Sequence, residues 1–568
     1  MTSRGPSPVL FNPSDRLTMG GINWHWNRPL MGVLLGGLLW RGWVAWNLPT
    51  GFDEVYYYLY SRHLSWSYFD HPPMVALTTG LGWWLTGVIT PFTLRLGALL
   101  LHGISLVLLY RTAAHLYNRR TGFLAVAIAS LVPLFWIGFG VLTSPDNALI
   151  LFWSLVLYGA ALEFFPHHEA IRTGGGLSYQ PSWRLAGLGM GIGLAALSKY
   201  HGFILGFGLL GFCLTRRRTQ KILISPWMGL AVGLGLAVLT PLWVWNSHHD
   251  WISFRFHLFM RFEGGEPRPY RILDALVTGL VGVAYLWPSL GFPLWWVTGR
   301  AIWRQFLAML QPPLSAVEQY GRDRDALILW LSLPIALGFT LLGGKQQIYP
   351  AWPAPGLWGL TLLLAHSVSA WRPIPLRRWL VGSGVAITVV CTLALLHLSL
   401  GILQKPGDYS LLGGFVPVEQ DGSTTLLNVE QLRHRLKEDP AVMAAIQQSD
   451  FVFTDEFYLS GYVDMAVYPL IDGQGPVGDH RPVTCFSQDP RGFAFWFNPD
   501  DWVGQNAVYI TLKSLHPELA QVTAEYQDFF ETLVPLGEID LTRGGVTTDT
   551  VLLYQAQTMV QAYPYPYG

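Results

Sequence analysis

GFDEVYYYLYSRHLSWSYFDHPPM, residues 51–74, follows the first long apolar run of the chain and combines acidic side chains with a dense set of aromatic rings. Asp53, Glu54 and Asp70 supply the carboxylates, and His71 stands directly before two prolines. Charges beside a membrane span are costly unless they serve a function. Carboxylates at the mouth of a membrane helix suit proton abstraction, metal binding or cation binding. We therefore place the chemistry in this stretch and expect the remaining chain to form a scaffold around it.

The composition indicates a protein with many membrane spans. Hydrophobic residues make up 51% of the 568 residues and charged residues only 13%, against about 25% in an ordinary soluble domain. The formal net charge is +0, and the short basic block TRRRTQK, residues 215–221, is better explained as a cytoplasmic anchor than as a nucleic-acid stripe. The cysteines Cys213, Cys391 and Cys485 lie far apart, so they support neither a disulfide framework nor a thiolate metal site.

Apolar runs of a length suited to spans of about 20 residues recur along the first 400 residues. About eleven runs fit, and they lie near residues 29–48, 94–116, 122–141, 148–165, 185–198, 201–215, 224–245, 272–298, 326–343, 354–370 and 379–400. Residues 1–28 lack the segment order of a cleaved signal peptide, so we expect a cytoplasmic N-terminal segment there. The transmembrane part is then 29–400, with a first external loop at 49–93.

The run at 74–90 is also apolar, and charge asymmetry decides how to treat it. If it lies along the interface as a juxtamembrane helix, the arginine clusters of the loops all fall on the side of the N-terminus. These clusters are Arg119 and Arg120, Arg172 and Arg184, Arg216 to Arg218 with Lys221, Arg300 and Arg304, and Arg372 with Arg377 and Arg378. We therefore predict that 74–90 does not span, and that everything after residue 400 lies outside.

The character of the chain changes after residue 400. The segment 424–450 has helical spacing, whereas FVFTDEFY (451–458), NAVYITLK (506–513) and DTVLLYQA (549–556) are typical of short buried strands. We predict a soluble α/β domain at 401–568, outside the membrane. The fold class is thus an α-helical polytopic membrane protein with juxtamembrane helices and a small extracytoplasmic α/β domain.

Acidic and basic side chains meet on the predicted outer face. The acids there are Asp53, Glu54, Asp70 and Asp146; the bases are Lys199, Arg255, Arg261, Arg268, Arg271 and Lys345; and the histidines are His71, His201, His248, His249 and His257. A carboxylate can take the proton of a hydroxyl or amine nucleophile, while cations neutralise a phosphate leaving group. This mixture describes a site for an anionic lipid-linked substrate and an acceptor that loses a proton.

Structural explanations exist for most of these residues. Asp53 and Glu54 could cap a juxtamembrane helix, and Asp146 in TSPDNAL fits an N-terminal helix position. Lys199 could reach the interface simply as a snorkelling side chain, and Lys345 could be an ordinary loop residue. The adjacent pair His248 and His249 resembles metal ligands, but neighbouring side chains do not converge from a helix, which favours a solvated loop.

Five motifs in order resemble a known family. They are FDEVYYYLYSRHLSWSYFDHPPMVA, LTSPDNALILFW, LSKYHGFIL, WISFRFHLFMRF and KQQIYPAWPAPG. They are similar to bacterial members of the dolichyl-phosphate-mannose protein mannosyltransferase superfamily, glycosyltransferases of family 39 with the GT-C membrane fold, which include the lipid A aminoarabinose transferase. The resemblance covers roughly residues 30–370.

The resemblance implies an integral enzyme of the bacterial plasma membrane. Such enzymes move a sugar from a polyprenyl monophosphate to an extracytoplasmic protein, lipid or glycan acceptor with inversion, without a nucleotide and generally without an essential metal. A divalent cation is possible but not indicated. Within this family pattern Asp53 is the acid that acts as base or orients the acceptor, Glu54 is its neighbour, and Asp146 is the second acidic position.

The same resemblance implies the groups that bind the donor. Lys199 matches a basic residue at a span end, and Lys345 and Tyr349 match a late loop with different spacing. His71 stands where the lipid A relatives have lysine, so a neutral imidazole would replace an ammonium unless phosphate raises its pKa. The full set of predicted donor or substrate ligands is His71, Asp70, Lys199, Arg255, Arg261, Lys345 and Tyr349.

Two other functions compete with the transferase. A transporter or flippase of lipid-linked sugars would use the same charges to hold a headgroup in transit, although it should carry acidic residues near mid-membrane in broken helices. A receptor-like scaffold whose tail binds a partner leaves the clustered acids and bases unexplained.

Overall fold

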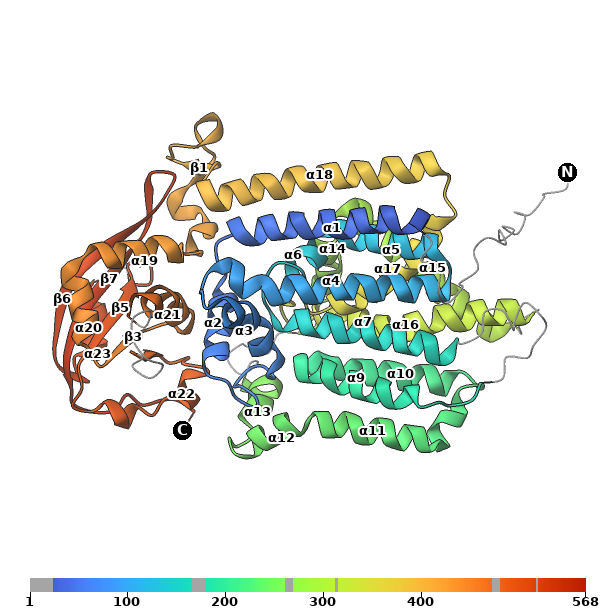
Figure 1. Cartoon of the computed structure of the whole chain (residues 1–568), viewed down its shortest axis with the longest axis horizontal. Helices are drawn as coiled ribbons and strands as arrows, with labels where there is room; N and C mark the ends of the chain where they lie inside the picture. Colours follow the sequence, from blue (N-terminus) through green and yellow to red (C-terminus); the bar gives the residue numbers. More distant parts are fainter. Residues whose placement is uncertain are drawn as a thin grey trace.

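A computed structural model of the chain describes residues 24–165, 179–260, 269–311, 315–471, 481–516 and 519–567. It consists of a bundle of long, roughly aligned helices with a β-sheet packed at one end (Figure 1). All strands of the described residues follow residue 403. We call the helices up to Leu400, apart from those at 52–62, 74–86 and 252–258, the membrane bundle, and we call the described residues from 401 to 567 the sheet domain.

The membrane bundle is built from fourteen helices in the described part of the chain. They are α1 (Trp24–Asn47), α4 (Pro91–Leu116), α5 (Arg119–Leu131), α6 (Pro133–Gly138), α7 (Pro145–Phe164), α9 (Arg184–Ser198), α10 (Phe203–Thr215), α11 (Pro226–Val238), α12 (Thr240–Ser247), α14 (Ile272–Tyr285), α15 (Pro288–Leu310), α16 (Ala316–Leu342), α17 (Ala354–Ser369) and α18 (Pro373–Leu400). Three further helices, α2 (Phe52–Arg62), α3 (Met74–Thr86) and α13 (Ile252–Leu258), lie between the bundle and the sheet domain.

Four described helices are long and apolar enough to cross a membrane alone, namely α4, α7, α16 and α18. The pair α11 and α12, bent by 47°, provides a fifth span if it is counted as one. The count of about eleven stays a prediction, because the other bundle helices are shorter or less apolar. Helix α3 has 13 residues and is about 20 Å long, less than the ~30 Å hydrocarbon core.

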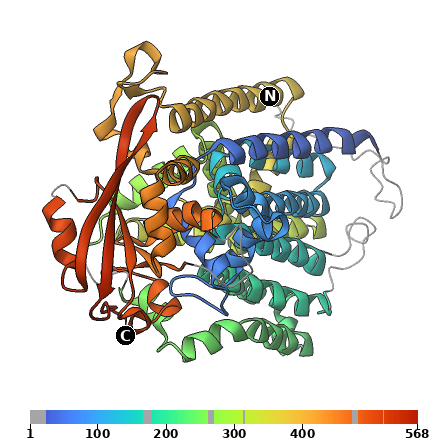
Figure 2. The same ribbon diagram turned by 60° about the vertical axis from the view of Figure 1, so that its left-hand side comes forward.

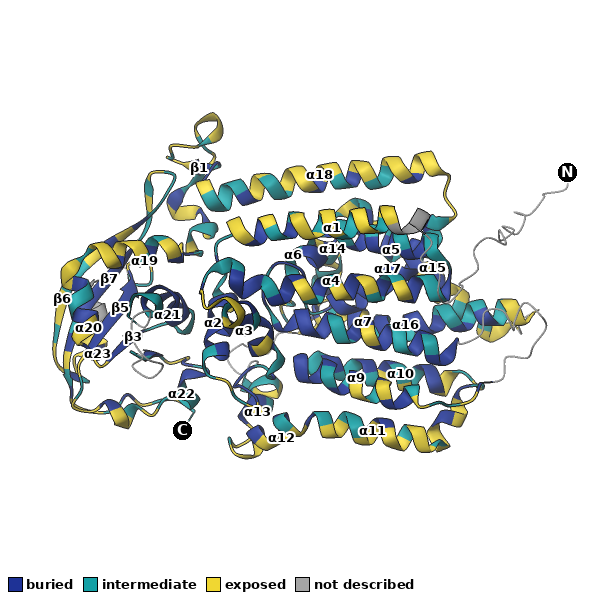
Figure 3. Ribbon diagram, viewed as in Figure 1, coloured by how far each residue is buried: buried dark blue, intermediate teal, exposed yellow. Residues whose placement is uncertain are grey.

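Burial differs strongly among the long helices (Figure 3). Helix α7 is mostly buried within the bundle, whereas α18 lies at its edge and is largely exposed along its length. Small residues allow the closest approaches: a Cβ added to Gly97 on α4 would lie 2.0 Å from the carbonyl oxygen of Thr78 on α3. Only glycine therefore fits at this crossing of α3 and α4.

The sheet domain contains a five-stranded sheet of order β4-β3-β5-β7-β6. The strands are β3 (Phe451–Thr454), β4 (Val483–Cys485), β5 (Ala507–Leu512), β6 (Phe530–Arg543) and β7 (Val546–Met559). Strands β3, β4 and β5 run parallel, and β7 pairs antiparallel with both β5 and β6. Helices α19 (Val429–Glu438), α20 (Pro440–Gln448), α21 (Phe457–Ile471), α22 (Phe493–Trp496) and α23 (Leu519–Tyr526) complete the domain. Strands β3, β5 and β7 coincide with the three predicted strands.

The sheet domain docks on α2 through α21 (Figure 2). A Cβ at Gly461 on α21 would lie 2.6 Å from the carbonyl oxygen of Val55, so no larger residue fits between the two helices. Next to this contact the hydroxyl of Tyr462 donates a hydrogen bond of 2.6 Å to the carbonyl of Thr50. The docking therefore fixes the sheet domain against the residues that lead into α2.

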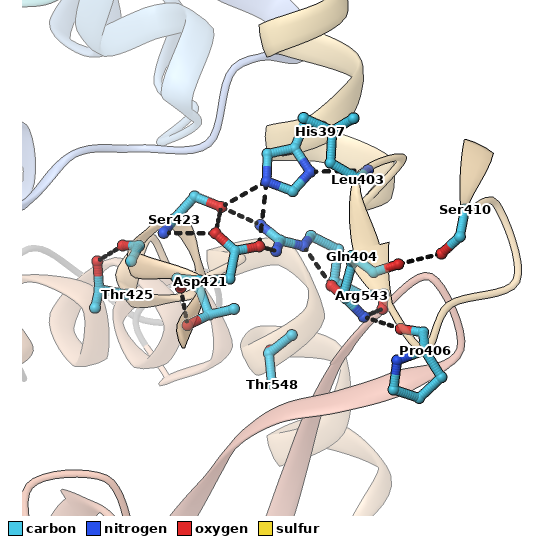
Figure 4. A network of polar contacts seen from close by, with 12 residues as sticks. His397, Leu403, Gln404, Pro406, Ser410, Asp421, Ser423, Thr425, Arg543 and Thr548 are labelled. Atoms are coloured by element: carbon cyan, nitrogen blue, oxygen red, sulfur yellow. Dashed lines mark hydrogen bonds and ion pairs between the residues drawn. The ribbon is translucent and has the colours of Figure 1, made fainter. Parts of the chain in front are cut away.

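A polar cluster joins the sheet domain to the end of α18 (Figure 4). The carboxylate of Asp421 accepts from Arg543 at 2.5 Å, lies 3.2 Å from the imidazole of His397, and accepts from the hydroxyl of Ser423 at 2.6 Å. Arg543 also donates to Gln404 at 3.1 Å. Because Arg543 ends β6 and His397 lies in the last turn of α18, this cluster ties the sheet to the last helix of the bundle.

Candidate active site

Residues 51–74 form helix α2 and the loop that leads from it to α3. Gly51 is extended and precedes the helix, and its N–H donates to the carboxylate of Glu54 at 2.9 Å. Acidic residues at the first turn suit the positive end of the helix dipole. Asp53 and Glu54 are adjacent on α2, so their side chains point in different directions.

The carboxylate of Glu54 is fully engaged by the protein. Arg95 donates to both of its oxygens, at 2.8 Å and 2.6 Å, and the N–H of Thr143 donates at 3.0 Å. The same arginine donates to the carbonyls of Leu48 and Pro49. A buried carboxylate with these partners holds α1, α2 and α4 together, and the catalytic role of Glu54 stays a prediction beside this structural one.

Asp53 differs from Glu54 in its exposure and in its partners. Its side chain is exposed, and the described part of the chain gives it no hydrogen bond or ion pair. Protein atoms nevertheless surround it closely, and this desolvation raises the pKa of Asp53. Arg491 and Lys199 oppose the shift, whereas the carboxylates of Asp70 and Glu54 add to it. Asp53 is thus an accessible carboxylate with enhanced basicity between two cations and two other acids.

Asp146 and Lys199 neutralise each other. Asp146 lies in the first turn of α7, and Lys199 follows the last residue of α9. The ammonium donates to both carboxylate oxygens, at 2.9 Å and 2.7 Å, and both side chains are buried. The two side chains therefore form a buried ion pair, and the predicted catalytic role of Asp146 and donor-binding role of Lys199 stay predictions.

The loop of Asp70 and His71 lies against α2. The hydroxyl of Tyr60 donates to the carboxylate of Asp70, and the hydroxyl of Tyr57 lies 3.0 Å from Nε2 of His71. Burial raises the pKa of Tyr57, and the carboxylates of Asp53, Asp70 and Asp146 raise it further. Tyr57 is therefore the neutral group around which three of the four predicted acids gather.

The predicted donor ligands from later loops have exposed positions. The side chains of Arg255 on α13, Lys345 and Tyr349 are all exposed. The backbone N–H of Arg271 donates to the carbonyl of Gly344, and this hydrogen bond ties the Lys345 loop to the start of α14. Arg261 and Arg268 lie outside the described residues. His257 on α13 contacts the Asp70 loop through a 2.7 Å hydrogen bond to the Asp70 carbonyl.

The adjacent histidines His248 and His249 lie at the end of α12, and His249 contacts Trp245. Nδ1 of His249 lies 2.7 Å from the carbonyl of Trp245, and its ring stacks on that tryptophan at 4.0 Å. Within the described ranges, no three His, Cys, Asp or Glu side chains converge on a point where an ion could bind. His248 and His249 thus lie in the turn between α12 and α13, where His249 packs on Trp245.

Arg491 is the functional residue that the sequence did not reveal. It follows β4 in the sheet domain, has a left-handed backbone with φ of 48°, and reaches the Asp70 carboxylate at 3.5 Å. Its guanidinium lies 3.8 Å over the ring of Phe457 and also pairs with Asp489 at 3.2 Å. Burial alone would lower the pKa of Arg491, but Asp70, Tyr56 and Asp489 outweigh burial and raise it. A permanent cation of the sheet domain therefore completes the site, and nothing in the pattern around Asp489–Gly492 signals this.

Known proteins that resemble this chain include membrane glycosyltransferases. Residues 70–245 match the family model described as dolichyl-phosphate-mannose-protein mannosyltransferase. A curated relative, the lipid A galacturonosyltransferase RgtD of Rhizobium johnstonii, is 26% identical over 375 residues, which are 62% of this chain and 68% of RgtD. The chain is a membrane glycosyltransferase that is similar to these proteins.

Solved structures show that the glycosyltransferase shares its fold with ArnT of Cupriavidus metallidurans. The apo structure of ArnT superposes with a TM-score of 0.57 at 15% identity, covering 94% of this chain and 98% of ArnT. The structure of ArnT bound to undecaprenyl phosphate superposes with a TM-score of 0.54 over the same shares. The shared fold includes both the membrane bundle and the sheet domain, because the superposition covers nearly all of both chains.

Proposed function

We propose that this glycosyltransferase moves a sugar from a polyprenyl-phosphate donor to an acceptor outside the cytoplasm, with inversion, and that Asp53 is the base. One observation carries the assignment of the base. Among the four predicted carboxylates, Glu54, Asp70 and Asp146 have cationic or hydroxyl partners, whereas Asp53 is exposed and lacks a described partner. Its raised pKa suits proton transfer near neutral pH better than that of an ordinary aspartate.

The chemistry balances with these groups. The acceptor oxygen or nitrogen loses its proton to the Asp53 carboxylate and forms a bond to the anomeric carbon of the sugar. The bond from that carbon to the phosphate oxygen breaks, and its electron pair leaves with the polyprenyl phosphate. Because a phosphate already leaves readily, the donor needs cations rather than a general acid. The exposed Arg255 and Lys345, with His71, are the groups we assign to the phosphate.

The sheet domain supplies the other side of this site. Arg491 opposes the rise in the Asp53 pKa, so it favours the ionised base. The chain enters α1 at the end of the membrane bundle far from the sheet (Figure 1), and the charge pattern predicts the loop arginines, such as Arg120 and Arg304, on this N-terminal side. By the positive-inside rule this end faces the cytoplasm, and the sheet domain lies outside. The lipid A in the name of RgtD supports an envelope lipid as acceptor, and the undecaprenyl phosphate bound to ArnT supports a prenyl carrier in the donor.

The test is sugar transfer in proteoliposomes. Purified protein would be supplied with a panel of radiolabelled polyprenyl-phosphate sugars and a membrane extract as acceptor, beside the variants Asp53→Asn and Asp500→Asn. Asp500 is an exposed aspartate of the sheet domain and serves as the control. We expect label to leave the prenyl carrier with the wild type and Asp500→Asn but not with Asp53→Asn. Label that stays on the carrier yet crosses the bilayer would instead make the protein a transporter.

A further inference from the structure

A groove runs along α16 between α10 and α15, and the mechanism does not use it. Its volume is about 740 Å³. Helix α16 lines it from Ala326 to Leu341, and the ends of α10 and α15 close its other walls. Those ends lie far from the sheet domain (Figure 1), so one mouth of the groove is at the membrane surface opposite the site of Asp53.

The long wall of the groove is apolar. Every α16 residue that lines it is a hydrocarbon, tryptophan, proline or glycine side chain, including Leu329, Trp330 and Leu337. The fifteen steps from Ala326 to Leu341 extend about 22 Å along a helix, which exceeds one leaflet of a hydrocarbon core about 30 Å thick. An acyl chain of a membrane lipid therefore fits along this wall.

Close packing against α10 holds Trp330, which lines the groove. A Cβ at Gly208 would lie 2.3 Å from the carbonyl oxygen of Trp330, and one at Gly211 would lie 2.4 Å from its ring. The Trp330 side chain is thus held over α10 at a fixed position in the groove. Pro334, which also lines the groove, interrupts the hydrogen bonding of α16 one turn further along.

The mouth of the groove is basic. Arg216 donates to Oε1 of Gln305 at 2.6 Å, and it shares the single carboxylate of Asp323 with Arg218, at 3.6 Å and 2.8 Å. Arg217 is exposed, and no described residue forms a hydrogen bond or ion pair with its guanidinium. Three arginines against one acid leave a positive charge at the point where the apolar wall meets the membrane surface.

We propose that this groove binds one anionic phospholipid of the leaflet opposite the sheet domain. The phosphate lies against Arg216 and Arg217, and one acyl chain follows α16 past Trp330. Basic pockets between membrane helices favour such headgroups because each cation near the surface contributes to binding. A zwitterionic lipid would bring its own ammonium group to the same arginines and so bind less well.

The first test is native mass spectrometry of the full chain in detergent, titrated with dioleoyl phosphatidylglycerol or dioleoyl phosphatidylcholine. We expect one molecule of phosphatidylglycerol to be retained and the choline lipid to be retained more weakly. Arg217→Gln should weaken phosphatidylglycerol binding about 5-fold. Arg377→Gln removes an exposed cation at the start of α18 on the same membrane surface and should leave the binding unchanged.

The second test reports position and does not depend on the arginine variants. Phosphatidylglycerol with brominated acyl chains should quench tryptophan fluorescence. Trp330→Phe should reduce this quenching, and it should reduce the quenching by the brominated choline lipid much less. Equal retention of the two lipids, unchanged binding in Arg217→Gln, or equal quenching with and without Trp330 would each overturn the proposal. Preferential retention of undecaprenyl phosphate over phosphatidylglycerol would also overturn it, and would assign the groove to a prenyl carrier.

Discussion

The guanidinium of Arg491 lies 3.5 Å from the carboxylate of Asp70, so a residue of the sheet domain meets the loop that follows the first membrane helix. Both domains contribute charges near Asp53, because Arg491 lowers the pKa of Asp53 and Asp70 raises it. The site therefore belongs to neither domain alone, and each charge in it makes a separate prediction.

Arg491→Gln should reduce transfer by up to about 100-fold, because loss of a positioning group near a site has effects of that size. Since Arg491 lowers the pKa of Asp53, its removal should also raise that pKa further. The acidic limb of the kcat/KM profile should then move to higher pH, which a purely structural role would not produce. Arg481→Gln, a substitution elsewhere in the sheet domain, should change neither the rate nor the limb.

Asp53→Asn should lower kcat by about 10²- to 10⁴-fold, the usual contribution of a general base. The wild-type rate should fall as the pH drops through the raised pKa of Asp53, because the carboxyl must be ionised to accept a proton. A raised carboxyl pKa means that the ionised group destabilises the fold above its unfolded pKa. The variant should therefore melt at the same or a higher temperature, and a lower melting temperature would indicate a structural Asp53.

Glu54→Gln should destabilise the protein by about 3–5 kcal/mol, because it leaves buried Arg95 without its charge partner. The pair Glu430 and Arg433 is the matched control, since Glu430 is exposed and such pairs contribute at most about 1 kcal/mol. Thermal unfolding of Glu54→Gln and Glu430→Gln would measure the difference. Equal effects of the two substitutions would contradict the structural role of Glu54.

Asp421→Asn should remove a pH-dependent part of the stability. Burial would raise the pKa of Asp421, but hydrogen bonds from Ser423 and the charges of Arg543 and His397 lower it overall. A lowered carboxyl pKa contributes stability above the unfolded value of about 3.9, and this contribution is lost as the pH falls through the folded pKa. Melting temperatures of wild type and variant should differ by a steady amount from pH 6 to about pH 4, and the difference should shrink as the pH falls further. A difference that does not shrink below pH 4 would contradict the assignment.

The sequence could reveal the class of the fold because its signals are local. The apolar runs indicate membrane helices, and the strands at 451–454 and 507–512 and the apolar middle of the strand at 546–559 stand out in the sequence. Strand β6 was missed because most of its residues are exposed or half-buried, and β4 because it has three residues. A short or largely exposed strand can be recognised only from the strands that it pairs with in the folded sheet.

The candidate site could be predicted only in part. Asp53, Asp70 and His71 are close in sequence, and a loop between helices keeps them close in space. Asp146 and Lys199 lie on separate helices, so their spacing in the sequence does not predict that they form an ion pair. Arg491 lies in another domain, and the chain gives no local sign that it returns to the Asp70 loop.

The contact of Gly461 with the Val55 carbonyl also determines when the enzyme becomes complete. Asp53 is synthesised with the first tenth of the chain, while Arg491 comes from the last fifth. N-terminal segments fold before the rest of a nascent chain emerges. The membrane half is therefore inserted without the arginine that favours an ionised base, and we expect a half-made chain in the bilayer to transfer sugar no faster than Arg491→Gln until its final domain has docked on α2.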